Sequence, residues 1–416
     1  MNEVNFIKID WISIAILSLL IGLGLGNIYS SSQVYLLESL LNLNPFTKQL
    51  FFVFISFFVF IFIQLLPINF FIKYSSIIYV LSILSLIGLF LFGNEIKGTL
   101  AWYQFSNFSL QPSEFAKPIT ALALAKYLSD LNSNLKKIET QFYSFLIILI
   151  PVVLIILQPD PGSVLIFLSF VLVFYKVGLP SIYMNLFVGF IVLFFSSILF
   201  STFYILFLIL FIALALIFFN KKNKTTVRKI FLYGTIFSVF IFSVDFIFNN
   251  IFEQRHRDRF NVVLGLEKDL KGTAYNYNQS RIALASGGIL GEGFLKGTQT
   301  RGKFVPEQHT DYIFSTVGEE WGFLGSSFII FLYSFLMLRI SKRADLQKNV
   351  FSKIYSYSTV TLIFSHFFIN IGMVIGLVPT IGIPLPFLSY GGSNLIAFCL
   401  LFSIYIKLDS QRTSKW

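Results

Sequence analysis

Residues 51–92 read "FFVFISFFVFIFIQLLPINFFIKYSSIIYVLSILSLIGLFLF" and contain one charged side chain, Lys73. About 20 apolar residues suffice for a helix to cross the hydrocarbon layer of a membrane. This stretch therefore predicts two successive membrane-spanning helices, at 49–71 and 75–93. Helices are expected because every backbone polar group in lipid needs a partner within its own segment.

The rest of the chain repeats this pattern. It has 416 residues, of which 56% are hydrophobic and only 12% are charged, too apolar a composition for a soluble core of this size. We therefore predict an all-α, polytopic helical membrane protein with about 12 transmembrane helices. The spans are expected at 10–29, 49–71, 75–93, 113–129, 141–157, 162–177, 180–199, 201–219, 229–248, 312–338, 353–377 and 387–407.

The distribution of basic residues predicts the orientation. The short loops 220–229 and 339–353 each hold five Lys or Arg, and the C-terminal tail is also basic. All three lie on one side if 180–219 is a helical hairpin, and that side is then cytoplasmic, together with both termini. Loop 249–311 then lies outside, within a single membrane domain that spans residues 1–416. We interpret the net charge of +11 as cytoplasmic anchoring charge, so no nucleic-acid partner is expected.

Several kinds of chemistry find little support in the sequence. The single Cys399 excludes an intramolecular disulfide framework. The three histidines lack the spacing of zinc ligands, and no phosphate-binding loop, dinucleotide-binding fingerprint or serine nucleophile elbow is present.

Most of the unusual polar residues fall on the predicted outer face. In "QPSEFAK" (111–117), Glu114 lies in the first turn of a helix, and Lys117 follows on the same face. The two residues form either a local ion pair at a helix end or a charged site in a partly dry cavity, since ionisable groups at membrane depth are often functional.

Two more carboxylates begin predicted helices on this face. Asp160 lies between two prolines in "QPDPGS", and Asp311 precedes the helix that starts at 312. Asp160, and either Thr310 or Asp311, are candidates for N-caps. Alternatively, Glu114, Asp160 and Asp311 converge on one site if their helices pack together.

Other polar residues of this face also suggest functions. Glu319 and Glu320, about two turns deeper, need partners, for which Lys117 or an arginine is the expected kind. "YNYNQSRIALASGGILGEGF" (275–294) predicts a short helix on the membrane surface, where Arg281 is suited to hold a phosphate and Gln279 is a further candidate for substrate binding. In the irregular segment 383–396, backbone N–H groups and Ser393 are suited to bind an anion.

These stretches, taken in order, resemble the SEDS family (shape, elongation, division and sporulation). The resemblance rests on "NFSLQPSEFAK", "QPDPGS", "QSRIALASGGILGEGFLKGTQ", "FVPEQHTDYIFSTVGEEWGFLG" and "NIGMVIGLVPTIGIPLPFLSYGGSN". The "KGTQ" and "VPEQHTD" segments look more like the elongation branch than the division branch. The family usually has ten spans, so the hairpin 180–219 looks like an addition, and Pro161 and Ser163 are atypical of the family.

The resemblance implies a peptidoglycan glycosyltransferase in the bacterial inner membrane, with its active site on the outer face. Its substrate would be lipid II and its partner a class B penicillin-binding protein. By the same resemblance, Asp311 matches the family's essential aspartate and Trp102 a functional tryptophan. Glu114, Lys117 and Asp160 match further family positions.

The implied reaction inverts the configuration at C1 of the donor sugar. It needs a base for the acceptor hydroxyl, for which we choose Asp311. It also needs positive charge for the leaving pyrophosphate, from Lys117 and Arg281, with a divalent cation (Mg²⁺ or Mn²⁺) as a further candidate. The main alternative is a transporter that flips the lipid-linked precursor, but the middles of the predicted helices carry few charges. A scaffold for a partner enzyme would leave the polar cluster unexplained.

The predicted topology can be tested by cysteine labelling in intact cells. A cysteine at Asn223, in the predicted cytoplasmic loop, is expected to resist a membrane-impermeant reagent, whereas one in loop 249–311 is expected to react. Labelling at Asn223 from outside would contradict the hairpin 180–219.

Overall fold

The structure is a computed structural model that describes residues 9–32, 44–96, 98–105, 108–130, 135–219, 223–251, 254–264 and 275–412. The described residues form two compact units. The first comprises residues up to Gly178 and from Asn276 onward, and the second comprises Leu179–Tyr275. A single membrane domain over residues 1–416 therefore stays a prediction, and each unit is described by itself.

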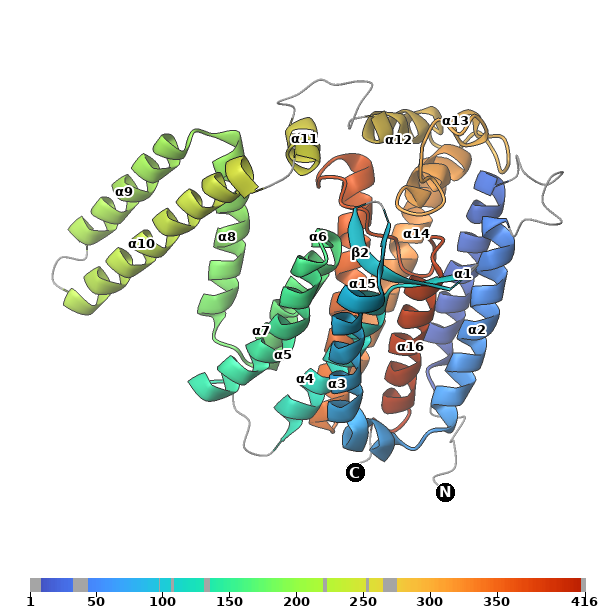
Figure 1. Cartoon of the computed structure of the whole chain (residues 1–416), viewed down its shortest axis with the longest axis horizontal. Coiled ribbons are helices and arrows are strands. Elements are labelled where there is room, and N and C mark those ends of the chain that lie inside the picture. Colours follow the sequence, from blue (N-terminus) through green and yellow to red (C-terminus); the bar gives the residue numbers. More distant parts are fainter. Residues whose placement is uncertain are drawn as a thin grey trace. The chain divides into compact units, whose positions relative to one another are not determined.

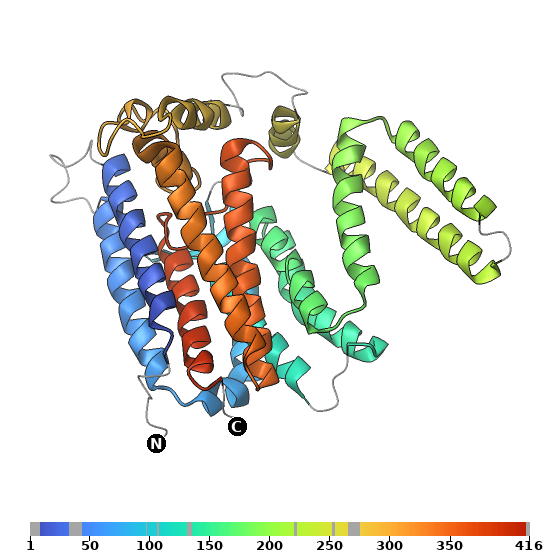
Figure 2. The ribbon, with the colours of Figure 1, turned by 180° about the vertical axis from the view of Figure 1, so that it is seen from behind.

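The first unit is a bundle of long helices with a small sheet at one side (Figures 1 and 2). Its elements are α1 (Trp11–Ser32), α2 (Pro45–Leu65), α3 (Ile68–Phe92), β1 (Asn94–Ile96), β2 (Thr99–Phe105), β3 (Phe108–Leu110), α4 (Pro112–Ser129), α5 (Ile138–Leu157), α6 (Pro161–Leu168), α7 (Val171–Val177), α12 (Tyr275–Ser286), α13 (Thr298–Arg301), α14 (Ile313–Asp345), α15 (Val350–Ile375) and α16 (Gly392–Asp409). The start of α1 and the end of α16 lie at the same end of this bundle (Figure 1). This placement is consistent with termini on one side of a membrane.

The second unit consists of α8 (Ser181–Leu199), α9 (Thr202–Phe219), α10 (Lys224–Phe246), a π-helical turn (Ile247–Ile251) and α11 (Gln254–Val263). Helices α8 and α9 cover the residues of the predicted hairpin, but α9 packs mainly against α10, so the hairpin stays a prediction. The ring of Phe190 in α8 packs against Phe240 in α10, with the ring centroids 4.6 Å apart. Asn223 caps α10 by accepting a hydrogen bond from the Thr226 N–H at 3.2 Å.

The prediction of a polytopic helical membrane protein is confirmed. Within the described residues, ten helices are long and apolar enough to cross a membrane: α1, α2, α3, α5, α8, α9, α10, α14, α15 and α16. The other two predicted spans correspond to α4, which is more polar, and to the short pair α6 and α7, an apolar stretch over Pro161–Val177.

Two predicted boundaries are wrong. The break between the second and third spans falls at Leu66 and Pro67, not near residue 73, because both residues have extended backbones. Proline disfavours the helical conformation in the residue before it, here Leu66. Helix α14 continues to Asp345, well beyond the predicted end at 338. The basic residues expected in the loop after α14 therefore begin on the helix itself.

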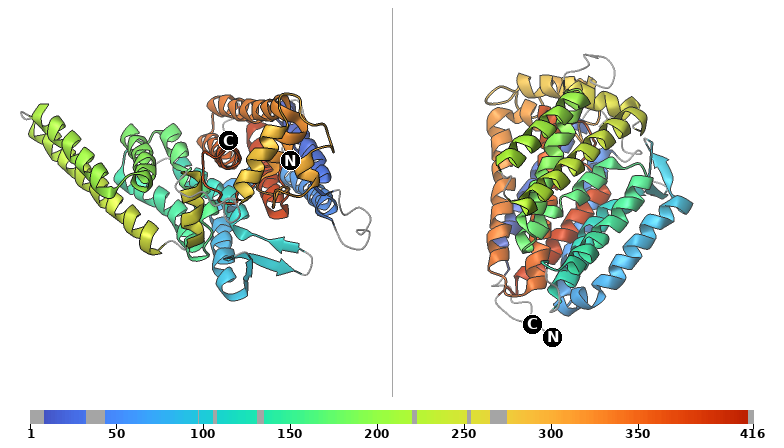
Figure 3. Two further views of the ribbon diagram at one scale, coloured as in Figure 1. Left: turned by 90° about the horizontal axis from the view of Figure 1, so that it is seen from above. Right: turned by 90° about the vertical axis from the view of Figure 1, so that its left-hand side faces the viewer.

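A three-stranded antiparallel sheet was not predicted. It has the order β1-β2-β3 and lies beside α3 (Figure 3). The Tyr103 hydroxyl donates to the Ser85 carbonyl at 2.8 Å, and the Leu100 N–H donates to the Gln158 carbonyl at 3.2 Å. These bonds fix β2 to α3 and to the end of α5. The sheet thus sets where the chain enters α4.

Helix α14 contains a break at Gly322, whose φ of 65° is readily adopted only by glycine. A Cβ on this residue would lie 2.3 Å from the Gly291 nitrogen. The backbone groups around the break pair with the loop before α13: Glu292 N–H bonds to Glu319 O at 2.9 Å, and Phe323 N–H bonds to Gly288 O at 2.9 Å. The loop after α12 is therefore attached to α14 by main-chain hydrogen bonds.

The irregular segment between α15 and α16 is held by the surrounding protein, as predicted for such backbone inside a membrane protein. The Tyr390 N–H donates to the His309 carbonyl at 2.8 Å. The side chain of Gln49 in α2 donates to the Ser389 carbonyl at 3.3 Å and accepts from the Gly391 N–H at 3.2 Å. Gly24 in α1 packs so closely that an added Cβ would lie 2.6 Å from the Leu388 carbonyl oxygen.

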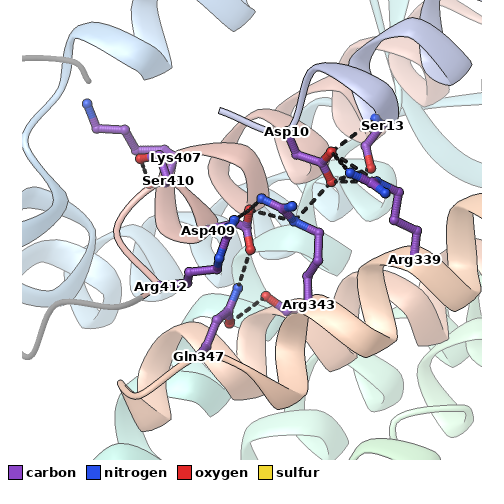
Figure 4. A network of polar contacts seen from close by, with 10 residues as sticks. Asp10, Ser13, Arg339, Arg343, Gln347, Lys407, Asp409, Ser410 and Arg412 are labelled. Carbon is purple, nitrogen blue, oxygen red and sulfur yellow. Dashed lines mark hydrogen bonds and ion pairs between the residues drawn. The ribbon is translucent and has the colours of Figure 1, made fainter. Parts of the chain in front are cut away.

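A network of ion pairs joins three helix ends at the opposite end of the bundle, near both termini (Figure 4). Arg339 donates to Asp10 at 2.7 Å, and Arg343 contacts both Asp10, at 3.0 Å, and Asp409. Arg412 lies 3.7 Å from Asp409. The side chains of both aspartates are fully buried, so the network links the start of α1 to the ends of α14 and α16.

The charge of Asp10 depends on this network. Burial raises the pKa of its carboxyl. Hydrogen bonds from Arg339 and Ser13 and the charge of Arg343 together lower the pKa by more than burial raises it, so the pKa lies below its usual 3.8. A lowered folded-state pKa means that the carboxylate contributes stability above that ordinary pKa. The contribution is lost as the pH falls through the lowered folded-state value.

Replacing the shared arginine is expected to destabilise the protein. Arg343→Met leaves two buried carboxylates without their common partner, and such a loss typically costs about 3–5 kcal/mol. Titration with a denaturing detergent in micelles measures the change. Lys342→Met is the matched control, because Lys342 is exposed on the same turn and is expected to change stability by less than about 0.5 kcal/mol. Equal stability of the two variants would contradict a stabilising role for the network.

Candidate functional site

The candidate site begins at the connection between β3 and α4. Pro112 occupies the first turn of α4, where its missing N–H leaves no bond unmade. The preceding Gln111 connects two other elements: its N–H donates to the Ser393 hydroxyl at 3.0 Å, and its side-chain amide donates to Asp160 at 3.1 Å. Residue 111 therefore ties the entry of α4 to the start of α16 and the start of α6.

Glu114 and Lys117 form the predicted ion pair, and both are buried. Their charged atoms are 2.7 Å apart, with exposed fractions of 4% for Glu114 and 2% for Lys117. The second oxygen of Glu114 accepts from the Asn394 amide at 3.0 Å, and the Lys117 ammonium lies 3.1 Å from Nε2 of His366. The local ion pair that the sequence offered as one alternative is therefore present, and it is buried and not exposed at the surface.

Burial explains why this pair has additional partners. An ion pair removed from water is tolerated when the remaining lone pairs and protons are also hydrogen bonded. Asn394 and His366 provide these bonds from α16 and α15. The Glu114–Lys117 pair therefore holds three helices, α4, α15 and α16, in one arrangement.

Asp160 acts as the N-cap of α6. It accepts hydrogen bonds from the Ser163 N–H at 3.1 Å and from the Ser163 hydroxyl at 2.8 Å. The Ser163 hydroxyl also lies 3.3 Å from Ser113 in α4. The capping interpretation is therefore correct. The bond from Gln111 shows that this aspartate also belongs to the polar cluster at the start of α4.

Asp311 lies half-buried immediately before α14. The N-cap position of α14 is Tyr312, so neither Thr310 nor Asp311 occupies the N-cap position predicted for it. The amide of Asn370 donates to the Asp311 carbonyl at 2.8 Å. A Cβ on Gly382 would lie 3.3 Å from a carboxylate oxygen of Asp311, so the carboxylate faces the irregular segment.

The three carboxylates lie along the irregular segment and the first turn of α16. Asp311 adjoins Gly382, and Glu114 bonds to Asn394. On the side of α6, a Cβ on Gly162 would lie 3.3 Å from the Ile383 side chain and 3.5 Å from Asp160. The structure thus brings the predicted residues from α4, α6 and the start of α14 to one stretch of backbone, residues 382–394.

The other predicted residues lie around this cluster. Trp102 is half-buried in β2, opposite Asn94. Arg281 is exposed on α12 and stacks on Tyr277, with its guanidinium carbon 5.5 Å from the ring centre. Gln279 is half-buried on the same helix, which crosses the end of the bundle as expected for a surface helix (Figure 2).

The Ser393 hydroxyl was predicted to bind an anion, but in the structure it is hydrogen bonded to the protein. Its hydroxyl accepts from the Gln111 N–H at 3.0 Å and donates to the Ser109 carbonyl at 3.3 Å. These bonds use the hydroxyl to join α16 to β3 and α4. Ser393 therefore supports the shape of the site through the protein backbone.

The expected cationic partners of Glu319 and Glu320 are wrong. The Glu319 carboxylate accepts from the N–H groups of Gln299 and Thr300, at 2.6 and 2.9 Å, at the start of α13. Glu320 accepts a short hydrogen bond from the Ser30 hydroxyl in α1. Backbone N–H groups at the start of α13 and the hydroxyl of Ser30 thus take the role that an arginine or lysine was expected to fill.

The sequence analysis missed three polar residues that complete the site: His366, Asn370 and Asn394. Each is at least nine-tenths buried in a predicted span. A polar side chain in an apolar helix is itself a signal, because it needs a partner inside the protein. The histidines were interpreted only as possible metal ligands, so a hydrogen-bonding role for His366 was not predicted.

The described residues bring together no group of three or more His, Cys, Asp or Glu side chains that could hold a metal ion. The carboxylates of the site are used by protein donors, as Asp160 is by Ser163 and Gln111. The residues present therefore do not form a metal site by themselves. The divalent cation stays a prediction from the sequence, and no chemical step is derived through it.

Comparison with protein families gives one match, to the FtsW, RodA and SpoVE cell cycle proteins, over residues 10–207 and 204–414. The two matched segments together include all of α8 and α9, so the comparison does not show the hairpin to be an addition to the family. That feature stays a prediction.

Individual relatives match over most of the chain. A probable peptidoglycan glycosyltransferase FtsW from Wigglesworthia glossinidia brevipalpis is 31% identical over 88% of this chain and 83% of its own length. The peptidoglycan glycosyltransferase MrdB of Escherichia coli K12 is 29% identical, over 82% and 78%. RodA of Treponema pallidum is 30% identical, over 79% and 82%. FtsW and RodA relatives are equally similar, so assignment to the elongation branch stays a prediction.

Solved structures show the same fold. A chain from a peptidoglycan synthase complex that coordinates polymerisation and crosslinking aligns with a TM-score of 0.71 at 23% identity, covering 98% of this chain and 99% of that one. The rod shape determining protein RodA of Thermus thermophilus aligns with a TM-score of 0.63 at 21% identity, covering 98% of each chain.

Swapping the buried charges tests the Glu114–Lys117 pair. Lys117→Glu and Glu114→Lys each place like charges together in a buried site and are expected to reduce the folded fraction strongly, since breaking a buried pair costs about 3–5 kcal/mol. The double variant is expected to recover only part of it, because His366 and Asn394 are arranged for the original polarity. Size-exclusion chromatography in detergent gives the folded fraction.

The control is Lys126→Glu on the same helix. Lys126 pairs with Asp130 at 3.5 Å, but both side chains are substantially exposed, so the change is expected to be within about 1 kcal/mol. A Lys117→Glu protein that folds as well as Lys126→Glu would show that the buried pair does not hold the helices together.

Proposed function

This chain belongs to the FtsW, RodA and SpoVE family of cell cycle proteins, and we propose that it is a peptidoglycan glycosyltransferase that polymerises lipid II. Relatives that align with most of the chain carry that activity in their names. One observation indicates which residues would catalyse the reaction. The half-buried carboxylate of Asp311 lies beside Gly382, at the same irregular segment as the buried Glu114–Lys117 pair.

The proposed reaction is a single displacement. The 4-hydroxyl of the acceptor sugar attacks C1 of the donor sugar, and the bond from C1 to the lipid pyrophosphate breaks with inversion. The proton of the hydroxyl passes to the carboxylate of Asp311, and the electron pair of the broken bond leaves with the pyrophosphate. General base catalysis of this kind typically contributes about 10²–10⁴-fold to the rate.

Charge at the leaving group is the second requirement. Arg281 is exposed on α12, and its guanidinium is suited to bind pyrophosphate oxygens with two parallel hydrogen bonds. Lys117 is buried and already bonded to Glu114 and His366, so its proposed role is to support the site from beneath. Trp102 and Gln279 are proposed to line the path of the sugars.

We place the active site on the outer face of the bacterial cytoplasmic membrane. Helices α6, α14 and α16 begin at the site, and all three begin away from the end of the bundle at which α1 starts and α16 ends (Figure 1). Lys342 in the last turn of α14 and the loop residues Lys348 and Arg412 lie at the end of the bundle where α1 starts, which the positive-inside rule assigns to the cytoplasm. A substrate with a sugar in water and a tail in lipid fits a carboxylate at the edge of the membrane.

A transpeptidase is the proposed partner. The solved chain with the TM-score of 0.71 comes from a peptidoglycan synthase complex that couples polymerisation to crosslinking. By that analogy we propose that this protein works with a class B penicillin-binding protein. Glycan strands and the crosslinks between them would then be made by one assembly.

The sharpest test of the proposal is Asp311→Asn. The variant keeps the size and polarity of the side chain but removes its basicity, so it is expected to fold, bind lipid II and lose about 10²-fold or more of the polymerisation rate. Asp311→Glu is expected to restore activity only in part, because its longer stem misplaces the carboxylate. Purified protein, with its partner, is assayed by the length of glycan chains made from labelled lipid II.

Asp130→Asn provides the matched control, because Asp130 is an exposed aspartate at the other end of α4. It is expected to polymerise at the wild-type rate. Wild-type speed from Asp311→Asn would remove Asp311 as the base. A wild-type protein that makes no chains, even with its partner, would reject the proposed activity.

A further inference from the structure

Two side chains of helix α15 contact two successive carbonyl groups of the irregular segment. Nδ2 of Asn370 lies 2.7 Å from the Ile383 carbonyl, and Nδ1 of His366 lies 3.1 Å from the Pro384 carbonyl. The two residues are four apart, so they lie one above the other on the same face of the helix. The backbone beside Gly382 is therefore fixed to α15 by side chains and not by a main-chain ladder.

Each of these side chains also makes a second contact, to the site. Asn370 donates to the Asp311 carbonyl at 2.8 Å, and His366 lies 3.1 Å from the Lys117 ammonium. Asn370 is fully buried and His366 almost so. Helix α15 thus connects the irregular segment to the candidate base on one side and to the buried ion pair on the other.

The chemistry of the partners fixes the orientation of both groups. Nδ2 of Asn370 faces two carbonyl oxygens, which only accept, so this atom must be the NH₂ of the amide. Nε2 of His366 faces an ammonium, which only donates, and Nδ1 faces a carbonyl oxygen. His366 is therefore neutral, with its proton on Nδ1.

The arrangement of Asn370 leaves one polar atom unsatisfied. Its Oδ1 is buried and has no hydrogen-bond partner among the described residues. An unpaired buried acceptor typically costs about 1–3 kcal/mol. A residue chosen for stability alone would avoid this cost, whereas a residue that must offer two N–H groups to two particular carbonyls would not.

We propose that Asn370 is a positioning residue for Asp311, which locks the Asp311 backbone to the Ile383 carbonyl and so sets the direction of the carboxylate beside Gly382. The proposal rests on the proposed function, because it assumes that Asp311 is the base. Proton transfer needs the carboxylate within hydrogen-bond reach of the acceptor hydroxyl. A displacement of about 1 Å can cost on the order of 10²-fold in rate.

The test uses full-length protein with Asn370→Leu, which removes both N–H donors. The value of kcat for lipid II polymerisation is expected to fall about 10- to 100-fold with KM little changed, because substrate binding does not use Asn370. Asn370→Gln keeps the donors on a longer stem, and it is expected to fold and lose about 10-fold in kcat. This second variant decides the question if Asn370→Leu does not fold.

A double-mutant cycle separates positioning from general damage. If Asn370 acts through Asp311, Asn370→Leu or Asn370→Gln is expected to add little to the loss already caused by Asp311→Asn. Fully additive losses, or wild-type kcat in the Asn370 variants, would overturn the proposal. Ser365→Ala is the matched control, because its buried hydroxyl, one residue from His366, bonds to the Thr361 carbonyl within α15 and to no other group among the described residues. No change in kcat is expected.

Hydrogen exchange measured by mass spectrometry gives a readout that does not depend on activity. Asn370→Leu or Asn370→Gln is expected to speed exchange in the peptides around residues 309–313 and 381–390, and Ser365→Ala is not. Unchanged exchange there would contradict the proposed lock even if the wild-type protein polymerises. A wild-type protein without polymerase activity but with faster exchange in the variants would reject the proposed function and keep the structural lock.

Discussion

The structure depends on how the irregular backbone between α15 and α16 satisfies its hydrogen bonds inside a helical bundle. A helix would supply these bonds from its own residues, whereas this segment must take them from elsewhere, since each unmade bond in lipid costs several kcal/mol. They come from Gln49 in α2, His366 and Asn370 in α15, and the carbonyl of His309. The segment can therefore exist only when these helices are correctly packed.

This dependence explains why the polar residues of the site lie together. Every side chain that holds the irregular segment is itself fixed to a helix, and several make a second bond to a residue of the site. Asn394 connects α16 to Glu114, and Gln111 connects α4 to Asp160 and Ser393. The site is rigid because its supports are shared, which is the condition for holding a base and charged groups at fixed distances.

The two ends of the bundle use buried charge for different purposes. At the end near the termini, Arg343 joins Asp10 to Asp409 in a network that fastens helix ends together (Figure 4). At the other end, the Glu114–Lys117 pair is neutral as a unit and leaves Asp311 as a half-buried carboxylate at the same segment. The first arrangement contributes to holding the fold, and the second supports a surface where chemistry can take place.

Most of the helices, and the polar residues near their starts, follow from the sequence alone. Long apolar runs have to be helices in lipid. The first polar residues beside such runs are therefore expected near helix starts, and these include Glu114, Lys117, Asp160 and Asp311. The spacing of Glu114 and Lys117 along α4 was enough to predict that they pair, because residues three apart share a face of a helix. The resemblance to a family indicated which of these residues to examine.

The partners of these residues follow from the packing of the helices and not from the sequence. Asn370 meets Asp311 and Ile383 across 59 and 13 residues of chain, and His366 meets Lys117 across 249, so no local pattern could reveal these contacts. The partners of Glu319 were misjudged for the same reason: the free N–H groups of α13 become available only once the loop pairs with the break at Gly322. Helices follow from bonds between near neighbours, whereas a site is made by bonds between residues that only packing brings together.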